Sequence, residues 1–359
     1  MDLFVSARDV PMKRPRKVPK IPRPGRGKFP SFASREFPRQ AGFAIIRGEQ
    51  PTKTQMIFGA GNPAKLAQWR CASQRRVGQI AFVLFALLAL AFSIRAQNAQ
   101  DLVEHDLRIP EPGAGKQGLE AFMVRPSEPG PHPLVLLNHG SPRAGSDRRK
   151  MTPQEMLPQA REFARRGWTA VIVMRRGYGN SGGNYAEDAH PCSRHPDFYG
   201  SGIQSANDLR AAIAYLSRLP EVDPTRIISV GRSAGGLATV ALTAKPPAGL
   251  VAAISFAGGR GSPAKDEVCN SGDLIDAFRR FGKTSRVPML WVYAQNDHFF
   301  SPQLAAEFYR AFTSAGGRAQ FVSAAPFGTD GHRLFSEAGS PIWTPMVDAF
   351  LRKENLVLR

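Results

Sequence analysis

The sequence predicts an α/β domain with a mostly parallel sheet and helices on both faces. At 359 residues the chain is long enough for one large α/β domain or two small ones. Beyond about residue 100, short apolar runs alternate with amphipathic segments of helical length. Such runs are typical of strands buried on both faces, and their alternation with helices favours a parallel sheet joined by right-handed crossovers.

Six apolar runs are the expected strands, and six amphipathic segments are the expected helices. The strands are expected at 133–139, 168–175, 226–231, 250–258, 287–295 and 319–324. The helices are expected at 152–166, 201–219, 234–244, 274–281, 302–315 and 344–353.

The basic charge is concentrated at the N-terminal end of the chain. The formal net charge is +19, and residues 1–96 hold 18 Lys and Arg against 4 Asp and Glu. This leaves 30 basic and 25 acidic residues in 97–359, where no basic patch is interleaved with aromatic residues. Because nucleic-acid binding needs such a patch, we expect no nucleic-acid partner.

Residues 1–76 are predicted to form a disordered basic segment. Residues 1–55 are rich in Arg, Lys and Pro and lack a sustained helical or strand period, so they cannot bury a core. An alternative hypothesis is that residues 1–55 are not translated, because a start at Met56 would give a more usual distance to the export signal that follows.

Residues 77–96 are predicted to be a signal peptide that is cleaved after Ala96. The strongly apolar core, 80–92, is 13 residues long. That length is within the range of a signal peptide and short for a membrane span.

Two alternatives stay open for this segment: an uncleaved membrane anchor through residues 77–94, and a twin-arginine signal at Arg75 and Arg76. Whichever of these alternatives holds, positive charges precede the apolar core. The positive-inside rule therefore places residues 97–359 outside the cytoplasm, either periplasmic, secreted or membrane-anchored.

The strongest local motif is Gly231-Arg-Ser-Ala-Gly-Gly, which lies directly between an expected strand and an expected helix. A Gly-x-Ser-x-Gly string in that position describes a sharp turn that exposes the serine above the sheet. The helix N-terminus would offer the backbone N–H of Ala234 to a developing oxyanion. We therefore predict that Ser233 is a nucleophile, the alternative being a helix N-cap serine.

A serine hydroxyl is a weak nucleophile at neutral pH, so this hypothesis requires a base and a group that orients the base. In α/β enzymes of this kind the chain order is Ser, acid and His, each at a strand end. Asp297 and His332 follow the last two expected strands in that order. The rival acid is Asp330, which more often shapes a Thr-Asp-Gly turn, and the rival base is His298, beside the acid candidate.

A second oxyanion donor is expected after an early strand. His139-Gly-Ser-Pro follows the first expected strand, and a flexible glycine there lets a backbone N–H turn toward the site. We expect the donor to be Ser141, with Gly140 as the alternative. An ordinary glycine between strand and loop is the competing interpretation.

These motifs resemble the α/β-hydrolase superfamily, and within it the branch of dienelactone hydrolases and acyl-peptide hydrolases. The resemblance covers about residues 115–352. It implies an eight-stranded sheet, acyl transfer without a cofactor, and a triad of Ser233, Asp297 and His332. Dienelactone hydrolases proper use a cysteine nucleophile, so the serine here argues against dienelactone as the substrate. The resemblance rests on His139-Gly-Ser-Pro, Arg176-Gly-Tyr-Gly-Asn-Ser-Gly-Gly, Gly231-Arg-Ser-Ala-Gly-Gly, Asn296-Asp297 and Gly331-His332, in this order.

Two further stretches have structural interpretations. The glycine-rich stretch 176–183 has no Lys-Ser/Thr ending and no helix after it, which indicates a structured turn rather than a phosphate loop. His190, Cys192 and His195 lack a second strong cluster, so we expect no metal site. Cys192 and Cys269 both follow strands on the same sheet edge, which predicts a disulfide in an exported protein; two buried thiols are the alternative.

The sequence thus predicts an exported serine hydrolase that cleaves a carboxylic ester, with a small-molecule ester or a short peptide as substrate. A serine peptidase or aminopeptidase of the prolyl-oligopeptidase type is the alternative, because the Ser233 motif does not distinguish the two. Such peptidases commonly add a propeller or another large domain, which the sequence does not show. A non-catalytic binding protein on the same fold is the third hypothesis.

Overall fold

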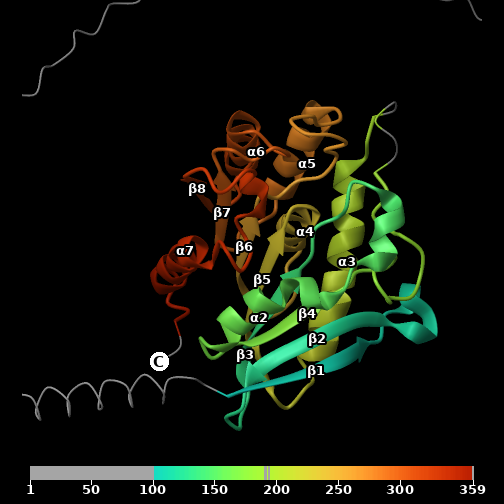
Figure 1. Ribbon diagram of the computed structural model, residues 1–359, viewed down its shortest axis with the longest axis vertical. Helices are drawn as coiled ribbons and strands as arrows, with labels where there is room; N and C mark the ends of the chain where they lie inside the picture. Colours follow the sequence, from blue (N-terminus) through green and yellow to red (C-terminus); the bar gives the residue numbers. More distant parts are fainter. Residues whose placement is uncertain (1–100, 190–191, 193–194, 358–359) are drawn as a thin grey trace, which may run out of the picture. The chain divides into compact units, whose positions relative to one another are not determined.

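The computed structural model describes residues 101–189, 192 and 195–357, which all belong to one compact unit, Gln74–Arg359 (Figure 1). The segments predicted to be disordered, 1–76, and to be an export signal, 77–96, lie outside the described residues. No helix in the described ranges is long and apolar enough to cross a membrane.

An eight-stranded sheet forms the centre of the domain, in the order β1-β2-β4-β3-β5-β6-β7-β8. β2 pairs antiparallel with β1 and with β4, whereas the remaining pairs are parallel, which confirms the predicted mostly parallel sheet. The strands are β1 (Leu102–Ile109), β2 (Leu119–Pro126), β3 (His132–Asn138), β4 (Thr169–Val173), β5 (Val222–Arg232), β6 (Leu250–Phe256), β7 (Met289–Ala294) and β8 (Ala319–Ala324).

β1 and β2 are absent from the six strands expected from apolar runs. β1 is an edge strand in which most residues are half-buried, so its sequence mixes polar and apolar residues. β2 alternates between buried and half-buried positions along its first half. A search for continuous apolar runs detects strands that are buried on both faces, and these two strands are not of that kind.

In the described part of the chain, six α-helices and four short 3₁₀ helices lie between the strands or after the last one. The α-helices are α2 (Leu157–Ala164), α3 (Phe198–Leu216), α4 (Ala234–Thr243), α5 (Ser271–Gly282), α6 (Pro302–Ser314) and α7 (Ser340–Lys353). The 3₁₀ helices are η1 (Pro112–Gln117), η2 (Gly145–Lys150), η3 (Pro153–Met156) and η4 (Gly331–Arg333).

Prolines explain the two main differences from the expected helices. The single helix expected at 152–166 is divided into η3 and α2, each with a proline in its first turn. The helix expected at 344–353 begins earlier, at Ser340, and also has a proline in its first turn. A proline fits the first helical turn because the N–H that it lacks has no intrahelical partner there.

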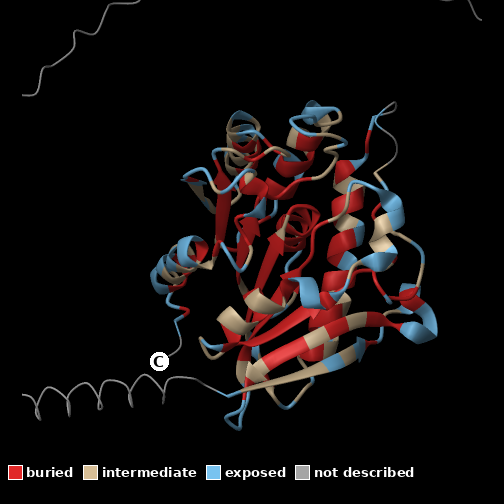
Figure 2. Cartoon of the chain, in the orientation of Figure 1, coloured by how far each residue is buried: buried red, intermediate tan, exposed pale blue. Residues whose placement is uncertain are grey.

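The sheet separates two hydrophobic cores. Leu134 and Leu136 of β3 pack into the core with α3, α4, α5 and α6, whereas Val135 and Leu137 pack into the core with α2 and α7. Successive strand residues point to opposite faces, so an uninterrupted apolar strand fills both cores. Figure 2 shows the result, with the central strands and α4 buried along most of their length.

Trp343 holds α7 against the sheet. Its ring packs on Phe335 at 4.9 Å between centroids and on Phe163 of α2 at 6.1 Å, and only 1% of its surface is exposed. Its indole nitrogen donates a 2.8 Å hydrogen bond to the backbone oxygen of Ser336. α7 follows directly on the chain segment that carries His332, so this anchor also fixes the end of that segment.

Trp343→Ala is expected to lower the free energy of unfolding by about 3–5 kcal/mol, because it removes a large buried ring and leaves a cavity. Trp343→Phe keeps most of the packing and loses the hydrogen bond, so we expect a smaller loss of about 1–2 kcal/mol. Urea denaturation followed by circular dichroism measures both losses. Equal losses for the two variants would show that the ring does not anchor the helix.

Candidate active site

Ser233 lies in a sharp turn between β5 and α4. Its backbone angles are φ 57° and ψ −123°, a region that is unfavourable for a residue with a side chain. The chain passes so tightly here that a Cβ on Gly231 would lie 2.1 Å from the backbone oxygen of Gly235. A Cβ on Gly235 would lie 2.2 Å from the backbone oxygen of Asn138 on β3. The predicted turn is therefore present, and its two glycines are required by packing.

Asp297 and His332 come together at the ends of β7 and β8, as the sequence predicts. His332 Nδ1 lies 3.0 Å from Asp297 Oδ2 and 3.2 Å from Oδ1. The backbone N–H groups of Phe299 and Phe300 donate hydrogen bonds of 2.7 and 3.0 Å to Asp297 Oδ1. These bonds fix the carboxylate, and the carboxylate in turn selects the tautomer with the proton on Nδ1, which leaves Nε2 as an acceptor.

The rival residues have other roles. Asp330 Oδ1 accepts backbone hydrogen bonds from His332 at 3.0 Å and from His298 at 3.1 Å, so it shapes the turn as expected. The ring of His298 contacts Asp266 at 2.8 Å instead of Asp297. Neither rival takes part in the contact between Asp297 and His332.

The ring of Phe299 lies between the imidazole of His332 and the guanidinium of Arg143. The His332 imidazole stacks on Phe299 at 3.9 Å between centroids, with 15° between the planes. The guanidinium of Arg143 lies 3.8 Å from the centroid of the same ring. Two groups cannot both approach one face so closely, so they occupy opposite faces. This stack orients His332 and continues through Arg143, which donates to Ser262.

Gly140, Ser141 and Ala234, the expected oxyanion donors, all border Ser233. A Cβ on Gly140 would lie 3.2 Å from Ser233 Cβ and 3.8 Å from Oγ. Ser141 and Ala234 line a cavity together with Ser233. The hydroxyl oxygen of Tyr178, from the glycine-rich turn 176–183, lies at a hydrogen-bond distance of 3.0 Å from Ser141 Oγ.

His139 has a structural role in the same loop. Its Nδ1 donates to the backbone oxygen of Gly140 at 2.6 Å, and its Nε2 accepts from the backbone N–H of Arg175 at 3.1 Å. Burial, together with the charge of Arg175, holds the pKa of His139 well below its usual range. The neutral ring therefore fixes the strand end that carries Gly140.

Ser233 opens into two cavities. The narrow cavity, of about 280 Å³, is lined by residues that include Ser233, Ala234, Glu187, Arg260, Cys192 and Cys269. The wide cavity, of about 1090 Å³, is lined by residues that include Ser233, His332, Gly140, Arg232, Arg333 and Phe327. The stacked pair Arg143 and Phe299 lines both cavities, as do Ser141 and Pro142, so this pair is part of the partition between the cavities.

A buried ion network, which sequence reasoning missed, forms one wall of the narrow cavity. The Glu187 carboxylate pairs with the guanidinium groups of Arg175 and Arg260 and accepts a 3.1 Å hydrogen bond from Tyr178. Arg260 donates a further 2.6 Å bond to the hydroxyl of Tyr185. Glu187 and Arg175 are fully buried. Burial alone would raise the pKa of Glu187, but the two arginines hold it well below its usual range.

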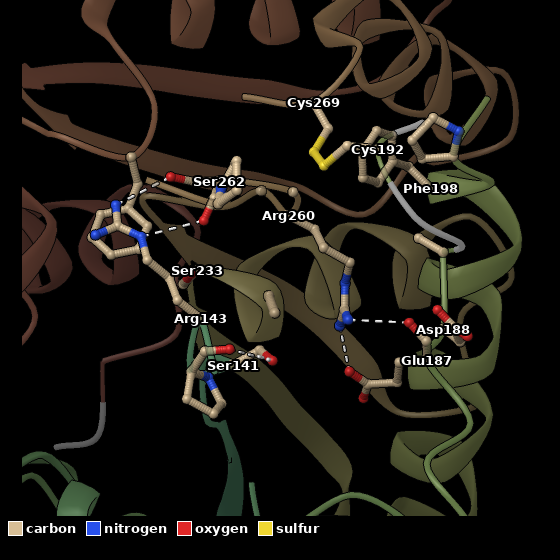
Figure 3. A pocket seen from close by; sticks show the side chains of 18 of the residues that line it. Ser141, Arg143, Glu187, Asp188, Cys192, Phe198, Ser233, Arg260, Ser262 and Cys269 are labelled. Carbon is tan, nitrogen blue, oxygen red and sulfur yellow. Dashed lines mark hydrogen bonds and ion pairs between the residues drawn. A yellow bond between two sulfur atoms is a disulfide. The ribbon is translucent and has the colours of Figure 1, made fainter. Parts of the chain in front are cut away.

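A disulfide forms another wall of the narrow cavity. The structure joins Cys192 and Cys269, with 5.2 Å between their Cα atoms, as the sequence predicts (Figure 3). Because Cys192 is bonded to sulfur, it offers no thiolate to a metal. His195 instead contacts Asp273 at 3.1 Å, and His190 lies outside the described residues. Among the described residues, no group of three or more His, Cys, Asp and Glu is arranged to hold a metal ion.

Comparison with known proteins agrees with this geometry. The X-Pro dipeptidyl-peptidase (S15) family matches residues 115–278, a segment that includes Ser233. No curated protein sequence matches the chain.

Solved structures give the fold. The acylaminoacyl peptidase of Pyrococcus horikoshii superposes with a TM-score of 0.52 at 14% identity, over 73% of this chain and 43% of that one. Esterase 2 of Thermogutta terrifontis superposes with a TM-score of 0.51 at 15% identity, over 71% of this chain and 96% of that one. The Pyrococcus furiosus esterase Pf2001 gives 0.50 at 13% identity, over 72% and 92%.

The chain has the α/β-hydrolase fold. The matched family and the structural neighbours are peptidases and esterases. The chain spans less than half of the length of the acylaminoacyl peptidase, but nearly the whole length of the esterases.

Replacement of Glu187 tests the buried network. Glu187→Gln leaves two buried guanidinium groups without their carboxylate, so we expect the free energy of unfolding to fall by about 3–5 kcal/mol at neutral pH. Because the pKa of Glu187 is lower in the folded state than its ordinary value of 4.5, its stabilising effect is complete above that pH. The difference between wild type and variant should therefore narrow by about 1.4 kcal/mol per pH unit below 4.5.

Urea titrations between pH 7 and pH 3 measure this difference. The control is Asp276→Asn, which removes an exposed pair with Arg279 and should cost less than about 1 kcal/mol at any pH. If the free energies of unfolding of wild type and Glu187→Gln differed by the same amount from pH 7 to pH 3, the lowered pKa of Glu187 would be contradicted.

Proposed function

We propose that this protein is a serine hydrolase of the α/β-hydrolase type, an exported carboxylic ester hydrolase in which Ser233, His332 and Asp297 form the catalytic triad. The observation that supports the triad is the fixed contact between Asp297 and His332, at a cavity that His332 shares with Ser233. His332 acts as the general base, and Asp297 orients its ring and stabilises its charge. No metal or organic cofactor enters the mechanism.

The reaction takes two acyl-transfer steps. Ser233 Oγ attacks the ester carbonyl while His332 Nε2 takes its proton, and backbone N–H groups of Ala234 and Ser141 stabilise the oxyanion. Collapse of the tetrahedral intermediate breaks the ester bond, and His332 passes the proton to the departing alkoxide. Water then attacks the acyl-enzyme with His332 again as base, which releases the acid and restores Ser233.

The two cavities bind different parts of the ester in these steps. His332 protonates the leaving group, so the leaving group must lie on the side of His332, in the wide cavity. His332 does not line the narrow cavity, so the narrow cavity is left for the acyl group. Its volume, about 280 Å³, suits a short acyl chain or a single ring.

An ester suits this acyl cavity better than an aminoacyl group. An α-ammonium group would need a free carboxylate, but Glu187 is already paired with Arg175 and Arg260, and Asp188 also has a partner. The described residues that line the cavity offer no other acidic side chain. Peptide hydrolysis is the second candidate, and the S15 family match favours it. Comparing the hydrolysis of esters with that of aminoacyl anilides distinguishes the two.

A fluorophosphonate probe should label wild-type protein at Ser233 and should not label Ser233→Ala, as measured by intact-protein mass spectrometry. Ser314→Ala, which changes an exposed serine at the end of α6, should label like wild type. Hydrolysis of p-nitrophenyl acetate and butyrate should exceed hydrolysis of aminoacyl anilides, and Ser233→Ala should lower kcat by at least about 10⁴-fold. Absence of labelling in folded protein would support a binding protein instead.

Export is proposed from the sequence of residues 77–96. Expression of the full chain in a Gram-negative host should yield a periplasmic or secreted protein whose N-terminus is Gln97. N-terminal sequencing of that fraction checks the cleavage site. A membrane-bound product that retains residues 77–94 would support the anchor, and a cytoplasmic product would contradict export.

A further inference from the structure

Two arginines stand out among the charged residues that line the wide cavity, because no described residue accepts a hydrogen bond from either guanidinium. Arg232 is the last residue of β5, directly before Ser233, and Arg333 directly follows His332 in η4. No ion pair or side-chain hydrogen bond joins either guanidinium to another of the described residues. Both residues line the wide cavity.

The other charged groups that line the wide cavity are already engaged. Lys150 pairs with Asp147 at 2.8 Å. Asp330 accepts backbone hydrogen bonds, as described above, and Glu155 accepts the backbone N–H of Thr152 at 3.3 Å. Arg143 donates to the backbone oxygens of Ser262 and Ala264. Among the residues that line the wide cavity, Arg232 and Arg333 are thus the cations whose hydrogen-bond donors remain available to a ligand.

The surroundings of Arg232 are unfavourable for a lone cation. Burial lowers the pKa of Arg232, Glu155 raises it, and the charge of Arg333 lowers it by less than Glu155 raises it. The main cost to the Arg232 guanidinium is therefore its removal from water, which an accepting anion would offset. An anion bound by Arg232 and Arg333 together would gain charge-assisted hydrogen bonds from both.

We propose that Arg232 and Arg333 bind an anionic group, a carboxylate or a phosphate, on the leaving group of the natural ester. The inference rests on the proposed function, because that function places the leaving group on the side of His332. Arg232 reaches the part of the leaving group next to the ester oxygen, and Arg333, which is exposed, binds at the rim of the cavity. The two residues determine specificity and take no part in bond breaking.

The test compares two esters with the same acyl group. In 3-carboxyphenyl butyrate the leaving group carries a carboxylate, and in 3-carbamoylphenyl butyrate an uncharged amide stands in its place. We expect kcat/KM for the carboxylate ester to exceed that for the amide ester by about tenfold or more, the effect of one charge-assisted contact. Added salt should lower this ratio.

Substitutions test whether the two arginines cause the preference for the carboxylate ester. Arg333 lies outside the strained turn at Ser233. Arg333→Gln should reduce the ratio toward one by lowering kcat/KM for the carboxylate ester, while kcat/KM for the amide ester stays unchanged. Arg232→Gln should act in the same direction, and Arg352→Gln, which changes an exposed arginine of α7, should leave the ratio unchanged. A ratio that Arg333→Gln and Arg232→Gln both preserve would overturn the proposal.

A binding experiment separates failure of this proposal from failure of the proposed function. Calorimetric titration of Ser233→Ala should give tighter binding of 3-hydroxybenzoate than of 3-hydroxybenzamide, and Arg333→Gln in that background should remove the difference. Equal affinities, or equal kcat/KM for the two esters in a protein that the fluorophosphonate labels, would overturn the anion site and leave the serine hydrolase intact. No labelling and no hydrolysis of either ester would instead defeat the proposed function.

Discussion

The close packing of the turn at Ser233 is the constraint on which the candidate active site depends. Gly231 and Gly235 have no room for a Cβ, because the backbones of β3, β5 and α4 meet there. This packing holds Ser233 in an unfavourable backbone conformation, a strain on the order of 1–3 kcal/mol that the surrounding sheet must offset. The carboxyl ends of neighbouring parallel strands then supply the other groups: Gly140 from β3, Asp297 from β7 and His332 from β8.

The parts of this arrangement that follow from local sequence were predictable. Apolar runs mark strands buried on both faces, and the motif around Ser233 marks the turn between a strand and a helix. The contact of Asp297 with His332 was predictable because parallel strands end at one edge of the sheet, which brings residues 35 positions apart together. The same reasoning paired Cys192 with Cys269 across 77 positions.

The buried network around Glu187 was not predictable in this way. Nothing in the local sequence of Glu187, in a polar loop, indicates that it is fully buried, and its partner Arg260 lies 73 residues away in another loop. Charged loop residues are usually solvated, so burial of this kind is decided by tertiary packing. The strands β1 and β2 escaped prediction for a related reason, since partly buried strands lack a continuous apolar signal.

The stack of Arg143, Phe299 and His332 has a consequence for selectivity. Phe299 contacts the His332 imidazole on one face and the Arg143 guanidinium on the other, and both Phe299 and Arg143 border the two cavities. A bulky group that displaces the partition from either side therefore also displaces the imidazole. Under the proposed function, the preferences for acid and alcohol are therefore thermodynamically coupled. Residue changes on the two sides of Ser233 should then act non-additively, and whole esters should be selected rather than two independent halves.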